Sequence, residues 1–300
     1  MEVLLALIAA LLFALGTVLQ QKAGLDEPVD TAGHGGTSGL LVQMAKRPVW
    51  LAGIATDALG FVAQAIALTI GRLSVVQPLL VSSVVFALPL GARLTGQRVT
   101  RIDMLAALVV TVSLGLFLIV ANPSGGRDDA PLGQWLVAGG ACVAASAVLM
   151  LASRGGSPAR RAALIGSAAG ILFGLSAALT KTVGDQFADA PLSIFTHWHV
   201  YALAVIGYVS MTLSQLSLQT GVLAPAIATS MALDPVTSVV LGTTLMQETL
   251  HTTTLGAITA LAALAVALGG IAVLSRTQGE TVATKPVSGA GKVAVPEAAA

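Results

Sequence analysis

The sequence predicts an all-α polytopic membrane protein with about nine transmembrane helices. Hydrophobic residues make up 55% of the 300-residue chain and charged residues only 10%, whereas a soluble domain is about one-quarter charged. Nine stretches reach the roughly 20 apolar residues that a helix needs to cross the hydrocarbon core. These stretches are continuously apolar rather than alternating, which excludes a closed β-barrel.

The predicted spans follow one another with mostly short connections. They cover residues 2–22, 49–70, 73–94, 103–121, 132–152, 161–182, 197–217, 222–246 and 254–274. We do not expect the first to be a cleaved signal peptide, because it lacks a basic leading region and ends with Lys22 rather than a small-residue cleavage site. The polar loop 24–46 includes a short apolar piece within 37–46, which is expected to re-enter the membrane or lie at its interface.

The placement of basic residues indicates the orientation of the spans. With nine spans, the loops on one side hold twelve of the fifteen Lys and Arg residues, and the other side holds only Arg72, Arg127 and Lys181. Basic loops stay in the cytoplasm, so the N-terminus is expected outside and the C-terminus inside a bacterial cytoplasmic membrane. Residues 276–300 lack large apolar side chains and are predicted to form a disordered cytoplasmic tail.

Charge and cysteine content exclude other classes of protein. The net charge of +1 gives no sign of nucleic-acid binding, so the lipid bilayer and a small solute are the expected partners. The single cysteine, Cys142, lies in an apolar segment and excludes both a disulfide framework and a cysteine metal site.

The first four spans resemble the last four. LLFALGTVLQQKAG (11–24) aligns with ILFGLSAALTKTVG (171–184), and LTIGRL (68–73) aligns with LQTGVL (218–223). One span separates the two blocks, and an odd spacer inverts the second block relative to the first. The sequence therefore predicts two inverted four-helix repeats, residues 1–121 and 154–275, joined by a central linker helix within 122–153. Inverted repeats are typical of secondary transporters, which bind their solute between the two halves.

Several segments carry a resemblance to a known family. They are the helix start at Trp50 and Gly53, the region of Gly60, the short turn into VVQPLL (75–80) and the segment PVTSVVLGTTLMQETL (235–250). On these residues the chain resembles the drug/metabolite transporter superfamily and, within it, the EamA-like and NIPA-like (magnesium-transporter-like) nine-helix branch. The resemblance covers residues 2–275 and implies the fold and the transport of a small solute.

The sequence also departs from the magnesium-transporter-like branch. That branch carries a glutamate where Phe61 stands here, and the acid of this chain is Asp57, one turn earlier. At the end of the first repeat, Arg98 replaces the usual glutamate, whereas the second repeat retains Glu248.

Polar residues within the second and third spans are candidates for binding a solute or a coupling ion. A charge at mid-membrane costs about 3 kcal/mol on insertion scales, so Asp57 is expected to face the bundle interior or a water-filled cavity. Gln64 lies two helical turns further along the same face, and Gln77 begins the adjacent antiparallel span. We expect the three to line one cavity. The alternative is that they form interhelical hydrogen bonds that lock the pair of helices.

A second acid, Asp234, stands beside Pro235 in the eighth span, which also contains Pro225. A proline removes a backbone donor and frees a carbonyl, and a broken helix with an adjacent acid is typical of a midplane binding site. The corresponding span of the first repeat contains Pro78 and Pro89. These four prolines are therefore predicted to break helices that line the cavity, with Asp234 as a second binding acid. The alternative is a packing kink in which Asp234 caps the following half-helix.

Other polar side chains give weaker signals. His197 and His199 are expected at the membrane interface rather than in a metal site, because no third His or Cys is near. Gln215 and Gln219, near the end of the seventh span, are weak candidates for the second half of the cavity.

Three glycines, Gly166, Gly170 and Gly174, form a stripe at i, i+4 spacing on the sixth span. Such a stripe favours close helix packing. The packing is expected either between the two halves or between the protomers of a homodimer.

The motifs favour transport over catalysis. No nucleophile–His–acid set, P-loop or dinucleotide fingerprint is present, so neither an enzyme nor a cofactor is predicted. The favoured interpretation is a secondary transporter of a small metabolite or drug-like solute, coupled to protons through Asp57 or Asp234 or to the membrane potential. A second interpretation is a divalent-cation (Mg²⁺) transporter in which those two acids bind the metal. A third is a non-transporting subunit of an envelope-biosynthesis complex, whose function would depend on the glycine stripe.

Overall fold

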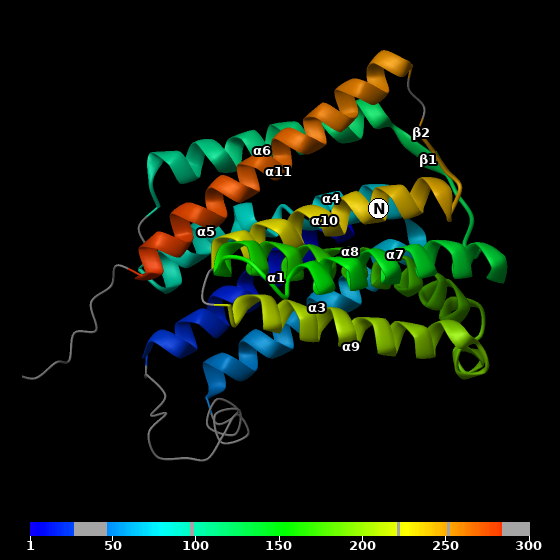
Figure 1. Cartoon of the computed structure of the whole chain (residues 1–300), viewed down its shortest axis with the longest axis horizontal. Helices are drawn as coiled ribbons and strands as arrows, with labels where there is room; N and C mark the ends of the chain where they lie inside the picture. Colours follow the sequence, from blue (N-terminus) through cyan, green and yellow to red (C-terminus); the bar gives the residue numbers. More distant parts are fainter. Residues whose placement is uncertain (27–46, 97–98, 221–222, 251–252, 284–300) are drawn as a thin grey trace, which may run out of the picture.

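The computed structural model describes residues 1–26, 47–96, 99–220, 223–250 and 253–283. Within this part of the chain, nine helical segments are long and apolar enough to cross a membrane. The protein is therefore an all-α polytopic membrane protein, as predicted (Figure 1). The predicted interfacial or re-entrant segment 37–46, Arg98 and residues 284–300 of the predicted tail lie outside the described residues.

The helices follow the order of the predicted spans. They are α1 (Glu2–Asp26), α3 (Pro48–Ile70), α4 (Leu73–Leu80), α5 (Ser83–Leu94), α6 (Arg101–Ala121), α7 (Leu132–Ala152), α8 (Pro158–Asp189), the short 3-10 helix η1 (Ser193–Thr196), α9 (Trp198–Leu218), α10 (Leu223–Thr244) and α11 (Thr254–Ala283). Most bounds agree with the predicted spans to within a few residues. Two differ more: α8 is longer at both ends, and α11 continues into the segment predicted as a tail.

Local capping chemistry explains where several helices begin. Thr100 and Asp103 form a capping box at the start of α6, in which each side chain accepts a hydrogen bond from the other's backbone N–H. The Ser157 hydroxyl accepts from the backbone N–H of Arg160 at the start of α8, and Pro158 occupies the first turn. A proline there costs no hydrogen bond, because first-turn N–H groups have no intrahelical partner.

The prolines affect two corresponding spans differently. The predicted third span is divided into α4 and α5 at Val81 and Ser82, shortly after Pro78. By contrast, α5 runs without interruption through Pro89, and α10 does so through Pro225 and Pro235, so the breaks predicted at these three prolines are wrong. Pro225 lies in the first turn, where it displaces no donor, and Pro235 removes only one hydrogen bond from an otherwise continuous helix.

The helices of each sequence block pack mainly on one another, and a few helix pairs join the two blocks (Figure 1). In the first block α1 packs along α3 and against α4 and α5; in the second block α8 packs against α10 and α9, and also against the linker helix α7. Contacts of α4 with α10 and of α3 with α8 join the blocks, while α6 and α11 pack on each other. The largest hydrophobic cluster lies where the blocks meet and contains the fully buried Leu68, Leu73, Leu179 and Leu245.

Two short strands connect distant loops at one end of the bundle. Strand β1 (Pro123–Gly125) follows α6, and strand β2 (Glu248–Leu250) follows α10. They pair in antiparallel fashion, with Pro123 opposite Leu250 and Gly125 opposite Glu248. The pairing ties the end of the first block to the last loop of the second.

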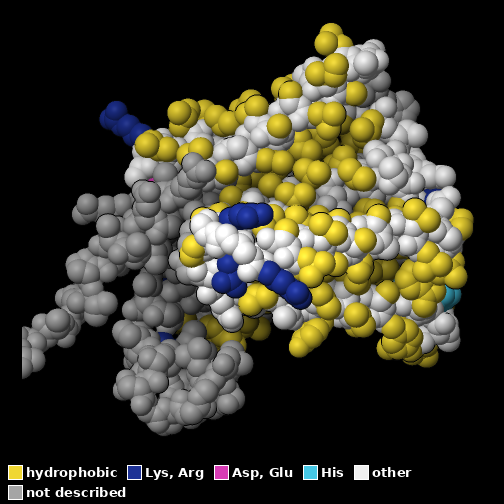
Figure 2. All heavy atoms as spheres, viewed as in Figure 1, with side chains coloured by type: hydrophobic (Ala, Val, Ile, Leu, Met, Phe, Trp, Pro, Cys, Tyr) yellow, Lys and Arg dark blue, Asp and Glu magenta, His cyan; other side chains and the backbone are white. Residues whose placement is uncertain are grey.

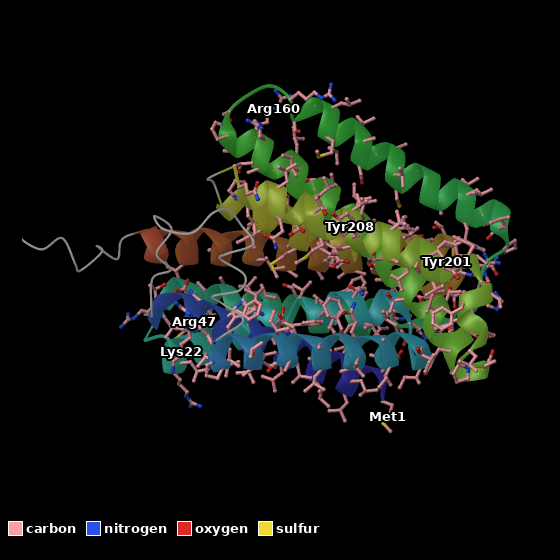
Figure 3. The ribbon with its side chains drawn as sticks, turned by 90° about the horizontal axis from the view of Figure 1, so that it is seen from below. Met1, Lys22, Arg47, Arg160, Tyr201 and Tyr208 are labelled. Atoms are coloured by element: carbon pink, nitrogen blue, oxygen red, sulfur yellow. The ribbon has the colours of Figure 1, made fainter. Side chains whose placement is uncertain are left out.

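Basic residues mark one of the two ends of the bundle. Lys22, Arg47 and Arg160 lie at one end, whereas Met1 and Tyr201 lie at the other (Figure 3). We call the first the basic end; it comprises the end of α1 and the starts of α3, α6 and α8. The opposite end comprises the start of α1, the end of α8 and the two strands. Hydrophobic side chains cover the flanks between the ends (Figure 2), as expected for a surface that contacts lipid.

Candidate functional site

A cavity of about 820 Å³ lies where the two blocks of helices meet. Its wall takes residues from α1, α3, α4 and α5 of the first block and from α8, α9 and α10 of the second. Phe13, Phe173 and Asp234, which lie near the midpoints of their helices, place the cavity at mid-membrane depth. Its volume falls within the range of roughly 300–1,000 Å³ that is usual for small-molecule sites.

Three of the four predicted binding residues line this cavity. They are Gln64 on α3, Gln77 on α4 and Asp234 on α10. The fourth, Asp57, is not on the wall. The predicted site is therefore largely brought together in space, because Gln64 and Gln77, on two consecutive helices, meet Asp234 from the distant α10.

Asp234 is the charged residue of the wall. No Lys, Arg or His side chain is among the described residues that line the cavity. The Asp234 carboxylate accepts a single long hydrogen bond, 3.4 Å from the Ser238 hydroxyl one turn further along α10. A carboxylate at this depth with one weak donor lacks the compensation that buried charges usually have. It is therefore poised to bind a proton or a cation.

Two further polar groups on the wall have no partner within the described structure. Gln77 is 2% exposed, and its side-chain Nε2 makes no hydrogen bond. The Ser176 hydroxyl, on α8, is also buried without a partner. An unpaired buried donor costs on the order of 1–3 kcal/mol, so a polar partner would stabilise both groups.

Asp57 instead joins two helices of the first block. Its carboxylate accepts a hydrogen bond of 2.6 Å from the Gln20 side-chain amide on α1. Gly16 lies directly against it, and a Cβ at that position would overlap the carboxylate. Asp57 and Gln64 do share a face of α3, as predicted, but that face meets α1 at the level of Asp57 and meets the cavity at the level of Gln64. An interhelical hydrogen bond therefore forms, as in the predicted alternative, but it joins α3 to α1 rather than to the third span.

The four prolines lie beside the cavity rather than on its wall. Pro78 and Pro235 each follow a wall residue, Gln77 and Asp234 respectively, but neither lines the cavity, and nor do Pro89 and Pro225. Neighbouring residues of an α-helix point about 100° apart, so a helix that presents Gln77 to the cavity directs Pro78 elsewhere. The helices that contain these prolines, α4, α5 and α10, do contribute to the wall, whereas the prolines themselves do not.

The apolar part of the wall was not predicted. It includes three aromatic rings: Phe13 on α1, Phe61 on α3 and Phe173 on α8. Phe13 and Phe61 meet edge to face with ring centroids 5.1 Å apart. The alignment of the two blocks did pair Phe13 with Phe173, but isolated phenylalanines in apolar helices carry no signal that separates a cavity wall from a lipid-facing surface.

The glycine stripe of α8 packs against α10 of the same chain. A Cβ on Gly166 would meet the carbonyl of Ala226 at 2.5 Å, one on Gly170 the carbonyl of Ser230 at 2.5 Å, and one on Gly174 the side chain of Thr237 at 2.7 Å. Both helices belong to the second block. The expectation that the stripe joins the two halves is therefore wrong, whereas the homodimer stays a prediction.

Glu248 joins the last loop to the start of α4. Its carboxylate is buried and accepts hydrogen bonds from the backbone N–H groups of Leu73 at 2.6 Å and Ser74 at 3.0 Å, and from the Ser74 hydroxyl. A carboxylate at a helix N-terminus satisfies unpaired donors and interacts favourably with the helix dipole. The glutamate that the family resemblance emphasised is therefore a cap between the two blocks.

Lys181 lies toward the opposite end of the bundle, beside the cavity. It is 5% exposed, and its ammonium donates to the backbone carbonyl of Leu68 at 3.2 Å and to Asp185 at 3.5 Å. Leu68 lies in the last turn of α3, where a cation is favourable. This buried lysine joins α3 to α8 and also lies 3.8 Å from the Asp128 carboxylate.

The two candidate histidines lie in an aromatic cluster at the opposite end. His199 accepts from or donates to the Gln186 amide at 3.0 Å and lies 3.2 Å from the Asp129 carboxylate, and its ring contacts the rings of Trp135 and Trp198. Within the described residues, no three His, Cys, Asp or Glu side chains are placed to hold a metal ion. Gln215 and Gln219 are not among the residues that line the cavity.

Comparison with known proteins gives one informative relative. The chain is 30% identical over 249 residues to an uncharacterized protein of Corynebacterium glutamicum, a match that covers 83% of this chain and 85% of that protein. No family model matches the sequence. No solved structure matches it either.

Proposed function

The chain belongs to the same family as the Corynebacterium glutamicum protein, and we propose that this chain is a secondary transporter of a small metabolite or drug-like solute. The observation that carries the proposal is the mid-membrane cavity shared by both blocks of helices, with Asp234 on its wall. Binding sites at that depth, between two halves of a helical bundle, are the usual arrangement in secondary transporters.

The predicted inverted repeat supports alternating access to this cavity. In the alignment of the two blocks, four pairs of equivalent positions fall on the wall: Phe13 with Phe173, Phe61 with Met211, Leu80 with Ser230, and Val81 with Met231. A pseudo-two-fold axis through the cavity would produce such pairs. Rocking of one half against the other would then expose the same site to each side of the membrane in turn.

Asp234 supplies a means of coupling transport to an ion gradient or to the membrane potential. It carries the charge of the wall and has one weak hydrogen-bond partner. Movement of a unit charge across the membrane potential is worth about 2.3 kcal/mol per 100 mV. A proton or a charged solute held by Asp234 would therefore couple the transport step to that potential.

The wall favours an organic solute over Mg²⁺. Mg²⁺ is bound through oxygen atoms and keeps several of its waters, whereas phenylalanine, leucine and methionine occupy much of this surface. Phe61, which replaces a glutamate of the resembling magnesium branch, is one of those residues. The subunit interpretation stays an alternative, but the glycine stripe on which its function would depend packs against α10 of the same chain.

Orientation belongs to the same proposal. Lys and Arg gather at the basic end, as Lys22, Arg47 and Arg160 illustrate (Figure 3), and the positive-inside rule would place that end in the cytoplasm. The N-terminus of α1 would then face outward from a bacterial cytoplasmic membrane.

Two-sided access to the cavity tests the transport proposal without knowledge of the substrate. The chain has one native cysteine, so Cys142→Ser gives a cysteine-free background in which Ser176→Cys places a single thiol on the wall. We expect a membrane-impermeant thiol reagent to label this cysteine in right-side-out and in inside-out vesicles alike. The cysteine-free background is the control. Labelling from one side only, or from neither, would contradict transport by alternating access.

A further inference from the structure

The chemistry of the cavity wall favours one sign of ligand charge. Its formal charge comes from one carboxylate, Asp234, and its aromatic surface comes from Phe13, Phe61 and Phe173. Both features favour positive charge in a ligand, since a carboxylate attracts a cation directly and the face of a phenyl ring carries a partial negative charge. Within the described lining, no cationic side chain is present to attract an anion.

We propose that the cavity binds an amphipathic organic cation, a molecule with one positive charge and an apolar body. The inference rests on the proposed transport function and specifies the substrate class of that site. Asp234 is the counter-ion of the cationic group. The phenylalanine rings pack against the apolar body and contribute cation–π attraction to the charge.

The weak solvation of Asp234 is the first reason to assign a cation. Its single hydrogen bond from Ser238 spans 3.4 Å, which is at the long limit for such a bond. A carboxylate at mid-membrane depth is costly unless a positive group lies near it. In the described structure that positive group is not a side chain of the wall, so the ligand supplies it.

The apolar surroundings are the second reason, and they exclude a hydrated metal ion as the best-fitting ligand. A hexahydrated Mg²⁺ presents only hydrogen-bond donors, which phenylalanine and methionine side chains cannot accept effectively. An organic ammonium, in contrast, loses less hydration on transfer and gains by burial of its carbon atoms. Gln77 and Ser176, whose side-chain donors are unpaired, can bind an oxygen atom on the same ligand.

The exposure of two wall residues indicates how such a ligand arrives. Phe61 on α3 and Met211 on α9 line the cavity, yet they are 63% and 53% exposed. They occupy equivalent positions in the alignment of the two blocks. Their exposure makes the cavity wall continuous with the lipid-facing surface of α3 and α9. An amphipathic cation that partitions into the bilayer can therefore reach the site sideways.

A matched set of aromatic probes tests the assignment on the purified full-length protein. Benzyltrimethylammonium, benzyl alcohol and benzenesulfonate share one ring and differ in charge, and MgCl₂ provides the metal arm. By isothermal titration calorimetry we expect the cation to bind at least about tenfold more tightly than the neutral and anionic probes, because Asp234 contributes only to the cation. Equal or tighter binding of benzenesulfonate, benzyl alcohol or Mg²⁺, or binding of no probe, overturns the inference.

Two substitutions separate the two parts of the proposed site. Asp234→Asn keeps the shape of the side chain and removes its charge. It should weaken binding of the cation about tenfold or more without changing the affinity for benzyl alcohol. Phe173→Leu keeps an apolar side chain and removes the ring, and should weaken binding of the cation about threefold to tenfold. Asp189→Asn and Phe187→Leu, exposed positions at the end of α8, are the matched controls. Unchanged cation affinity in Asp234→Asn, with native helicity by circular dichroism, also overturns the inference.

The test is independent of the transport test. Two-sided labelling of Ser176→Cys together with failure of the cation to bind would leave transport standing and remove the substrate class. One-sided labelling would instead remove the transport proposal, whatever the probes bind.

Discussion

At the residue scale, the same chemical type serves different purposes according to its surroundings. Three membrane-embedded or buried acids illustrate this. Asp57 accepts a hydrogen bond from Gln20 and joins α1 to α3, Glu248 caps α4, and Asp234 faces the cavity with one weak donor. An acid with strong donors is structurally satisfied, whereas one without them is available to a ligand. Hydrogen-bond partners, rather than depth in the membrane, therefore separate the structural acids from the candidate binding acid.

The cap formed by Glu248 gives a prediction about stability. Glu248→Ala removes the acceptor for the Leu73 and Ser74 N–H groups and leaves these buried donors unpaired. We expect the free energy of unfolding to fall by about 1–3 kcal/mol, measured by SDS-induced unfolding in mixed micelles. Thr249→Ala is the matched control, because Thr249 is exposed in the same strand, and it should change stability by less than about 0.5 kcal/mol. Equal effects of the two substitutions would show that the cap does not stabilise the fold.

At the scale of elements, the close approach of α8 and α10 is the feature that positions Asp234. Small residues let two membrane helices approach closely and pack by van der Waals contact. Gly170 lies against the backbone of Ser230, a residue of the cavity wall. The glycine stripe therefore acts on the site indirectly, through the spacing of the two helices.

A larger side chain at the stripe should disturb this packing within one chain. Gly170→Val would place Cβ 2.5 Å from the Ser230 carbonyl, so we expect a loss of about 1–3 kcal/mol from overpacking and no change in oligomeric state. Thermal unfolding and size-exclusion chromatography with light scattering measure the two quantities. Gly140→Val on α7 is the control, because a Cβ there meets open space. A change in oligomeric state with unchanged stability would indicate that the stripe contacts another protomer.

At the scale of the whole molecule, the two blocks differ in which equivalent residues reach the cavity. In their alignment Gly16, Gln20 and Asp57 correspond to Ser176, Thr180 and Gly207. The three residues of the second block line the cavity, whereas Gln20 and Asp57 of the first bond to each other between α1 and α3. This difference is what one of two alternating states of an inverted repeat would show.

Exchange of these roles gives a prediction about accessibility. In the Cys142→Ser background, Thr180→Cys should react with an impermeant thiol reagent from the opposite end, and Gln20→Cys from the basic end. Because the two positions open in different states, a condition that slows one reaction should accelerate the other; right-side-out and inside-out vesicles report the two rates. Gly140→Cys, on an exposed part of α7, corrects for non-specific labelling. If Gln20→Cys never reacts while Thr180→Cys does, the halves do not exchange roles.

The sequence by itself determined the spans and the depth in the membrane at which the candidate site lies. Apolar runs of about 20 residues fix membrane helices, because every backbone polar group must be satisfied within the helix in lipid. That constraint is local, so the spans were predictable to within a few residues for most helices. The same constraint makes polar residues within spans conspicuous, and Gln64, Gln77 and Asp234 stand out in the sequence for this reason.

Only the tertiary structure decided which of these residues meet and what surrounds them. In the folded structure Asp57 lies at the contact between α1 and α3, α10 is continuous through Pro235, and the glycine stripe faces α10. The three phenylalanines lie together on one wall. In a membrane helix most side chains are apolar on every face, whether that face meets lipid, protein or a cavity. The amphipathic pattern that reveals the buried face of a soluble helix is therefore missing, and the partners of each face follow only from the packing of the whole bundle.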